Sequence, residues 1–470
     1  MKKVIYLFSA VFLLLFFCKR DIKEPEYRTF KLNSIINGIK ENGFFGHSII
    51  SIGDINNDGG EEIVIGADGD GTDMQGKIYL FYSNSIKDTI NANSAKFGME
   101  GLYRNDRLGW SLDSRCDING DKIPDMVVGA IGCQKNGVFS GGVYIFYGKM
   151  ENGKLQYKKV NAMIYGEKEK SYLGWYVNIH GDFNNDNIND IVISAPGYDE
   201  NSGKVYVFYG RNFQEMTPAS DADVVFIGEN KNDRFGNSIT ILNDINGDNI
   251  NDLLVTAFTN SEKDVNSGKI YIFYGKKFHK VTVASEADIT ITGEKADDYF
   301  GEFSATAGDL NNDGREDFLI GASGADVLYN EGGAVYLFRS KFKSKKISSS
   351  DADMTMAGLK NGSKIGSFIL VPGDINGDGK TDLLVGGTGS DYKEDKGRVY
   401  FYSNERLLFK KKIPRPNRII HGFIEGSRFG NSICSADIDG DGLKEILIGA
   451  YYDSSDGKNF GRVYIYKLEK

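Results

Sequence analysis

The sequence predicts an all-β fold, a seven-bladed β-propeller made of four-stranded blades. Three observations support this prediction. A nine-residue acidic motif occurs seven times, its copies start 62 to 65 residues apart, and strand-like segments recur in the same phase. The copies begin at Asp54, Asp117, Asp182, Asp244, Asp309, Asp374 and Asp437. Repetition at this period indicates that one structural unit is repeated seven times.

Each repeat contains four short segments with strand character. In the fourth repeat they are residues 222–228, 237–242, 252–257 and 269–274. They are rich in β-branched and aromatic residues and are bounded by Gly and Asn, which is typical of strands. No part of the chain after the N-terminal apolar run shows a sustained helical period. Four strands per repeat therefore predict radially arranged sheets.

The two ends of the chain are expected to close the ring. Residues 30–38 align with the strand that precedes each Phe-Gly pair, and they have no preceding partner in their own repeat. Residues 461–466 form a last strand that is never followed by such a segment. We therefore expect the N-terminal strand to complete the C-terminal blade, which leaves no open sheet edge.

The acidic motif has the composition of a calcium-binding turn. Its clearest copy, Asp374 to Asp382, carries oxygen side chains at positions one, three, five and nine. Hard oxygen donors at alternate positions of a tight turn suit calcium, and we expect up to seven structural ions. The predicted ligands are Asp54, Asn56, Asp58, Glu62, Asp117, Asn119, Asp121, Asp125, Asp182, Asn184, Asp186, Asp190, Asp244, Asn246, Asp248, Asp252, Asp309, Asn311, Asp313, Asp317, Asp374, Asn376, Asp378, Asp382, Asp437, Asp439, Asp441 and Glu445.

The residue at position six of each turn is expected to influence how tightly that turn binds calcium. A left-handed backbone is favoured there, which Gly adopts without strain and Asn tolerates. Lys122 at this position predicts that the turn from Asp117 to Asp125 binds most weakly. The turn from Asp437 to Glu445 has four acids and Gly442, so it should be among the tightest.

Two other interpretations of the motif are less favourable. An EF-hand needs an acidic ligand at position twelve and flanking helices, but position twelve is apolar here, as in Ile65 and Val128. A metal-free Asn/Asp turn would crowd like charges without a compensating cation, seven times over.

Further residues keep step with the acidic motif. Phe45-Gly46 lies nine residues before Asp54, Gly66-Ala67 begins twelve residues after it, and the third repeat has Ser194-Ala195-Pro196. This pattern resembles the FG-GAP repeat, which builds the propeller of integrin α subunits and of related bacterial surface proteins. The resemblance covers about residues 29–470.

The resemblance implies that the acidic turns lie on one face and that ligands bind on the other. Loop tyrosines would suit an unidentified protein or glycan partner there: Tyr198, Tyr392, Tyr451 and Tyr452. The expected function is adhesion or ligand binding. The alternatives are a non-catalytic scaffold of the cell envelope and a carbohydrate-active propeller enzyme.

The N-terminus predicts export. Residues 1–17 combine a basic leader with an apolar run, as in a secretory signal peptide. Cys18 directly follows and resembles the lipid-attachment cysteine of bacterial lipoproteins; a plain signal peptide or an uncleaved anchor are the alternatives. We expect residues 18–28 to be a tether, residues 29–470 to be the propeller, and the protein to be a membrane-anchored lipoprotein, surface-exposed or periplasmic.

The net charge and the motifs present in the sequence make some classes of function less favourable. The net charge is −9, and 22 of the 65 acidic residues lie at the predicted ligand positions, so nucleic acid is not an expected partner. The four histidines, His47, His180, His279 and His421, share no register, and no Gly-x-Ser-x-Gly or His-Glu-x-x-His motif occurs. We therefore expect that the chain is not an enzyme. Trp110 and Trp175 are expected to face the central channel, as core residues or as a sugar platform.

Overall fold

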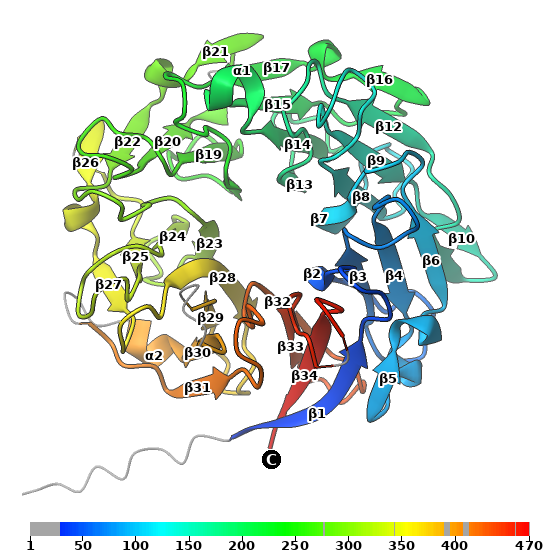
Figure 1. The fold of residues 1–470 in the computed structure, drawn as a ribbon. Helices are drawn as coiled ribbons and strands as arrows, with labels where there is room; N and C mark the ends of the chain where they lie inside the picture. Colours follow the sequence, from blue (N-terminus) through cyan, green and yellow to red (C-terminus); the bar gives the residue numbers. More distant parts are fainter. Residues whose placement is uncertain are drawn as a thin grey trace, which may run out of the picture.

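The computed structural model describes residues 29–275, 278–342, 344–389, 395–407, 413–455 and 457–469. Seven sheets stand side by side around a central axis and form a closed ring (Figure 1). The fold is an all-β, seven-bladed propeller, as the sequence predicts. The expected signal segment 1–17, the tether 18–28 and Cys18 lie outside the described residues.

Each blade runs from an inner strand at the central channel to an outer strand (Figure 1). The first three blades are β2 (Phe45–Gly53), β3 (Glu62–Ala67), β4 (Lys77–Phe81), β6 (Phe97–Glu100); β7 (Leu108–Cys116), β8 (Asp125–Ala130), β9 (Gly142–Phe146), β12 (Ala162–Tyr165); and β13 (Val177–Gly181), β14 (Asp190–Ala195), β15 (Lys204–Phe208), β17 (Val224–Ile227). The fourth and fifth are β18 (Ile239–Leu242), β19 (Asp252–Ala257), β20 (Lys269–Phe273), β22 (Ile289–Thr292); and β23 (Ser304–Gly308), β24 (Asp317–Ala322), β25 (Ala334–Phe338), β27 (Met354–Ala357). The last two are β28 (Ile365–Gly373), β29 (Asp382–Gly387), β30 (Arg398–Tyr402), β31 (Arg418–His421); and β32 (Ser432–Ala436), β33 (Glu445–Ala450), β34 (Arg462–Leu468), β1 (Phe30–Asn37).

The second strand of every blade is buried along its whole length. All six residues of β3, β8, β14, β19, β24, β29 and β33 are buried. A strand covered on both faces reads as a continuous apolar run instead of alternating, and the neighbouring blades provide that cover. The core accordingly divides into seven apolar clusters, one at each interface between blades.

The ring closes through the N-terminal strand. β1 pairs antiparallel with β34, with Ile36 opposite Val463 and Phe30 opposite Leu468. Figure 1 shows these two ends of the chain side by side. Ile36 is fully buried in the cluster between the last and first blades. The predicted closure is confirmed. It also means that the sequence repeat and the blade are offset by one strand, since the strand before each Phe-Gly pair is the outer strand of the preceding blade.

The prediction of four strands per blade is confirmed, and some blades carry one further strand that the sequence did not predict. Within the part of the chain that the structure describes, four of the seven sheets gain a fifth, three-residue strand that pairs parallel with an outer strand. These are β5 (Thr89–Asn91) on β1, β16 (Met216–Pro218) on β12, β21 (Val281–Val283) on β17 and β26 (Lys346–Ser348) on β22. Each comes from the next blade around the ring, so these strands tie neighbouring blades together at the rim.

The remaining elements are short. A hairpin, β10 (Lys149–Glu151) and β11 (Lys154–Gln156), projects from the second blade, and α1 (Tyr198–Asn201) and α2 (Asn404–Leu407) each span one turn. The 3-10 helices are η1 (Ser83–Ser85), η2 (Ala92–Ser94), η3 (Ala219–Asp221), η5 (Ala284–Glu286) and η6 (Ser349–Asp351). Within the described ranges, no helix has the length and apolar character needed to cross a membrane.

Candidate functional site

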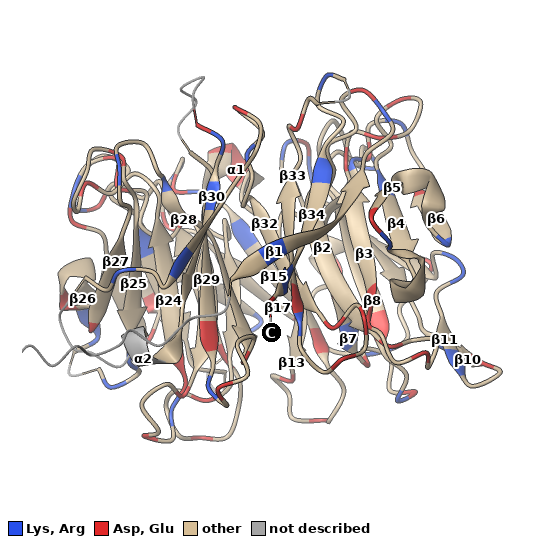
Figure 2. Cartoon of the chain, turned by 90° about the horizontal axis from the view of Figure 1, so that it is seen from below, with Lys and Arg blue, Asp and Glu red and all other residues tan. Residues whose placement is uncertain are grey.

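The seven acidic turns lie at one end of the ring, the lower end in Figure 2. Each turn joins the inner strand of a blade to its second strand. Position nine of the motif is in every case the first residue of the second strand: Glu62, Asp125, Asp190, Asp252, Asp317, Asp382 and Glu445. The repeat therefore places all seven sets of predicted ligands in equivalent surroundings.

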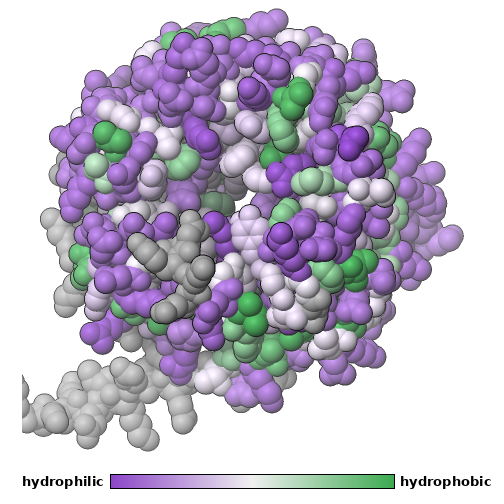
Figure 3. Space-filling view, viewed as in Figure 1, coloured by the Kyte–Doolittle hydropathy of each residue, from purple (hydrophilic) through white to green (hydrophobic). Residues whose placement is uncertain are grey.

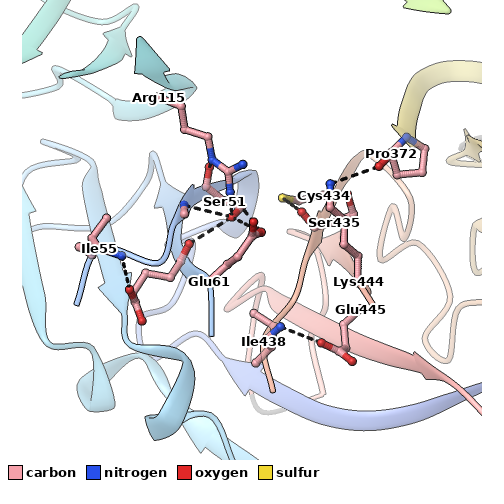
Figure 4. Close-up of polar contacts among 12 residues, drawn as sticks. Ser51, Ile55, Glu61, Arg115, Pro372, Cys434, Ser435, Ile438, Lys444 and Glu445 are labelled. Carbon is pink, nitrogen blue, oxygen red and sulfur yellow. Dashed lines mark hydrogen bonds and ion pairs between the residues drawn. The ribbon is translucent and has the colours of Figure 1, made fainter. Parts of the chain in front are cut away.

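The position-nine carboxylate is buried in all seven turns. Each accepts a hydrogen bond of 2.7 to 3.1 Å from the backbone N–H of position two, whose apolar side chain is itself buried. Figure 4 shows this contact between Ile438 and Glu445. Burial raises the pKa of Glu62, although the backbone hydrogen bonds oppose the shift. In the other six turns burial raises the pKa of the position-nine carboxylate to about 7 against the same opposing hydrogen bonds. These residues are Asp125, Asp190, Asp252, Asp317, Asp382 and Glu445. Among the described residues, no positive charge lies close enough to these carboxylates to offset their desolvation fully.

The position-one carboxylate organises the turn itself. In the sixth blade, Asp374 accepts hydrogen bonds from the N–H groups of Gly377 at 2.7 Å and Gly379 at 2.6 Å. Position six has a left-handed backbone in all seven turns, with φ between 64° and 99°. Lys122 adopts it too, at φ 64°, and donates its N–H to Asp117. The expected backbone conformation is confirmed, with the strain placed on Lys122.

Oxygen atoms of the turns fit a hard cation. The carboxylates of Asp54, Asp58 and Glu62 offer oxygens within 4.8 Å of one another, as do those of Asp437, Asp439 and Asp441. Asn311 Oδ1, Asp317 Oδ1 and Glu445 Oε1 are buried and accept no hydrogen bond from any residue that the structure describes. Leaving a buried oxygen unsatisfied is costly, so these atoms are suited to an oxygen-seeking ion.

A cation of the chain itself enters the seventh turn. The Lys467 ammonium, carried by β34, contacts Asp439, lies 3.1 Å from Asp441 and 3.7 Å from Glu445. Desolvation lowers the pKa of Lys467, but its hydrogen bonds to Asp439 and Asp441 outweigh this and hold the pKa above its usual value. The seventh turn therefore differs from the others in a way that the motif did not reveal.

The structure also assembles a polar cluster that the sequence reasoning missed. His180 contacts Cys116 through Nδ1, 3.1 Å from Sγ, and Asp113 through Nε2, 3.0 Å from Oδ1. The negative charge of Asp113 is the main reason that the pKa of His180 rises to about 11. Cys116 and His180 lie one and two residues before the first Asp of a turn in adjacent blades, and this nearness to the turns was the available signal.

Figure 3 views the opposite end of the ring. Aromatic side chains lie there near the start of the inner strands. Trp110 packs between His47 and Trp175, with ring centroids 4.5 and 4.8 Å away. Two of the tyrosines that were expected to be exposed for a partner contact other side chains of this chain. Tyr451 packs on His47 and Tyr452, and Tyr198 lies between two lysine ammonium groups. Both Tyr451 and Tyr198 are half-buried, and Tyr392 lies outside the described residues.

Comparison with known proteins agrees with this architecture. The FG-GAP repeat model matches residues 175–208, 300–338, 368–402 and 429–466. The chain is thus a seven-bladed propeller with four segments that match the FG-GAP repeat, and it is similar in sequence to integrin α subunits. Mouse integrin alpha-IIb is 34% identical over 34% of this chain and 15% of its own length.

Longer alignments are found with a second group. Phosphatidylinositol-glycan-specific phospholipase D of mouse is 24% identical over 89% of this chain, and that of rat is 26% identical over 76%. The alignments cover 54% and 45% of those proteins, so the chain spans about half the length of these relatives.

Their name is that of an enzyme, which contradicts the expectation that the chain is not one. That expectation relied on catalytic motifs of other folds, and a missing motif is weak grounds for excluding catalysis.

Proposed function

We propose that the chain is a calcium-stabilised, integrin-α-like propeller whose acidic turns hold up to seven calcium ions. The main support is the set of seven buried position-nine carboxylates, each beside more exposed carboxylates of the same turn and without a matching positive charge in most turns. The residues at positions one, three, five and nine would hold the ion. When bound, calcium supplies the positive charge that stabilises these carboxylates and fixes the turn.

Thermal melting with and without calcium tests this role. We expect calcium to raise the melting temperature and excess chelator to lower it, because an ion that binds only the folded state stabilises it. Asp378→Asn should reduce the calcium-dependent increase. Asp221→Asn, which alters an exposed carboxylate outside the turns, is the matched control. A melting curve that is the same in calcium and in chelator would refute the structural role.

Export and anchoring form part of the proposal. The basic leader, the apolar run and Cys18 support a lipoprotein held in the cell envelope by an N-terminal lipid. Cys18→Ala should then move the protein from the membrane fraction to the soluble fraction. Continued membrane retention of this variant would favour an uncleaved apolar anchor instead.

We further propose that the face opposite the acidic turns binds a protein or glycan in adhesion. The sequence similarity to integrin α subunits and the half-buried Trp110–Trp175 pair on this face support the proposal. Labelled protein should bind to cells or to an array of glycans and proteins, and Trp175→Ala should weaken that binding. Val281→Ala, an exposed residue at the outer rim, is a control. No binding to any partner in calcium buffer would count against this role.

A second candidate function is action on phosphatidylinositol-glycans. The long alignments with the phospholipase D relatives favour it. Purified chain would be incubated with membranes that carry a glycosylphosphatidylinositol-anchored reporter, in calcium buffer. Release of the reporter supports the activity, whereas release no greater than with heat-denatured chain argues against it.

A further inference from the structure

The residue before each Phe-Gly-like pair has a left-handed backbone in every blade. Their φ angles lie between 48° and 57°, although none of the seven is glycine. These residues form what we call the mouth ring: Phe44, Arg107, Tyr172, Arg234, Tyr299, Lys364 and Arg428. Bulky side chains rarely adopt this conformation, and local strain of this kind is concentrated at functional sites.

The strained turn brings two side chains together at the mouth of the channel, that of the mouth-ring residue and that of the residue after the Phe-Gly-like pair. In five of the seven blades the carbonyl of the mouth-ring residue accepts a hydrogen bond from the N–H three residues later. Examples are Tyr299 and Glu302 at 3.0 Å, and Arg428 and Asn431 at 3.1 Å. Between them lie the buried Phe300 or Phe429 and the glycine of the pair. The core thus fixes the turn, while positions on either side of the pair remain free to vary in chemistry.

The chemistry of the mouth differs between the two sides of the ring. In the first three blades the residues after the pair are His47, Trp110 and Trp175, which pack on one another. The mouth-ring cation there, Arg107, is paired with the buried Asp68 at 2.8 Å. In the fifth blade the residue after the pair is Glu302, which lines a cavity together with the mouth-ring residues Lys364 and Arg428 of the sixth and seventh blades.

This cavity has a volume of about 180 Å³. Lys364 and Arg428 supply two positive charges from adjacent blades, Lys364 also lying 3.7 Å from the Glu331 carboxylate, and Glu302 supplies one carboxylate to the cavity. Ser323 donates a hydrogen bond to Glu302, and Asn237 holds the Glu302 carbonyl at 2.8 Å. Burial raises the pKa of Glu302, and the charges of Lys364 and Arg428 partly oppose that shift. The cations are therefore close enough to the carboxylate to act on it, yet they leave it incompletely compensated.

The wall of the cavity is partly aromatic. Phe258 and Tyr299 lie at its edge with ring centroids 5.9 Å apart, and Thr388 adds a hydroxyl group. A concave site with a few converging polar groups and an aromatic wall is typical of small-ligand binding. The volume suits one six-membered ring with its substituents and not an extended chain.

We propose that this cavity binds a single sugar or polyol ring that carries an anionic group. The anion lies between Lys364 and Arg428, whose donors match phosphate and carboxylate oxygens. Ring hydroxyls donate to Glu302, and the ring face packs on Phe258 and Tyr299. The inference rests on the proposed role of this face in ligand binding and names the chemical class of one ligand.

Binding of small probes to purified residues 29–470 in calcium buffer tests the inference by titration calorimetry. The probes are myo-inositol 1-phosphate, glucuronic acid, neutral myo-inositol and inorganic phosphate. At least one anionic ring should bind more tightly than both myo-inositol and inorganic phosphate. The first two probes distinguish a phosphate from a carboxylate source. Equal binding of neutral myo-inositol would overturn the role of the cations, equal binding of phosphate would overturn that of the ring, and no binding of either anionic ring would overturn the proposal.

Matched substitutions in the mouth ring locate the binding. Lys364→Gln and Arg428→Gln should each weaken binding by about tenfold or more, because each removes a charged donor. Arg234→Gln alters a cation at the same left-handed position in the fourth blade, outside the cavity, and should leave the affinity unchanged. Equal losses in all three variants, or none, would overturn the assignment. Persistent binding to cells or arrays with no probe binding would reject the cavity while leaving the adhesive role intact.

Discussion

The Ser432 hydroxyl donates a hydrogen bond of 2.7 Å to the Gly46 carbonyl, across 386 residues of sequence. The same bond joins Ser48 to the Gly109 carbonyl at 2.7 Å and Ser111 to the Gly174 carbonyl at 2.8 Å. The interface between the last and first blades thus uses the contact found between the first and second and between the second and third. The ring closes with a regular interface, so closure needs no special element besides β1.

Ser432→Ala should lower the stability of the ring by about 1–2 kcal/mol, because it leaves the buried Gly46 carbonyl without this donor. Chemical denaturation followed by tryptophan fluorescence measures the change. Ser111→Ala serves as the comparison within the ring and should have a similar effect. An unchanged denaturation midpoint in Ser432→Ala alone would show that the closing interface is weaker than its geometry indicates.

The N-terminal strand should contribute to stability as a core element. Ile36 is fully buried between the last and first blades, so Ile36→Ala should cost about 2–5 kcal/mol. Asn33→Ala changes an exposed residue of the same strand and should leave the thermal melting temperature nearly unchanged. Equal melting temperatures for the two variants would contradict a structural role for β1.

The blade count and the closure could be predicted because both follow from the phase of the repeat. The strands of the fourth repeat were also predicted closely, as residues 252–257 for β19 and 269–274 for β20. The fifth strands could not be predicted. β16 is Met-Thr-Pro, which has little strand character of its own, and it forms only because β12 of the preceding blade lies beside it.

The candidate sites were predictable to different degrees. Ligand positions in the turns follow from local spacing, and the structure puts each set in one turn. The contact of Lys467 with the seventh turn depends on the pairing of β33 with β34, so the motif alone does not predict this contact. The charged cavity combines side chains from four blades and likewise has no local pattern. Tyr198 looked like a free loop aromatic because the lysines that flank it lie in other segments.

Lys122→Gly should stabilise the second turn. Lys122 has a left-handed backbone, which costs a residue with a side chain about 1 kcal/mol, and Gly adopts it without strain. The calcium concentration needed for half of the melting-temperature increase should fall. Asn187→Gly is the matched control at the same position in the third turn, where the gain should be smaller because Asn tolerates this region. Equal gains would show that the backbone at position six does not rank the sites.

Lys467 changes the expected rank of the seventh turn. Four acids and Gly442 predict tight calcium binding, but the ammonium 3.1 Å from Asp441 competes with an ion for the same oxygens. Lys467→Met keeps the apolar part of the side chain and removes the charge, so it should raise the calcium affinity of this turn by about tenfold, which corresponds to about 1.4 kcal/mol. Lys31→Met is the matched control, since Lys31 lies opposite Lys467 in the β1–β34 pair and is exposed. Calcium titration against a fluorescent chelator measures both variants. An affinity that is unchanged or lower in Lys467→Met would mean that this lysine does not compete with the ion and that the acids of the turn set its rank.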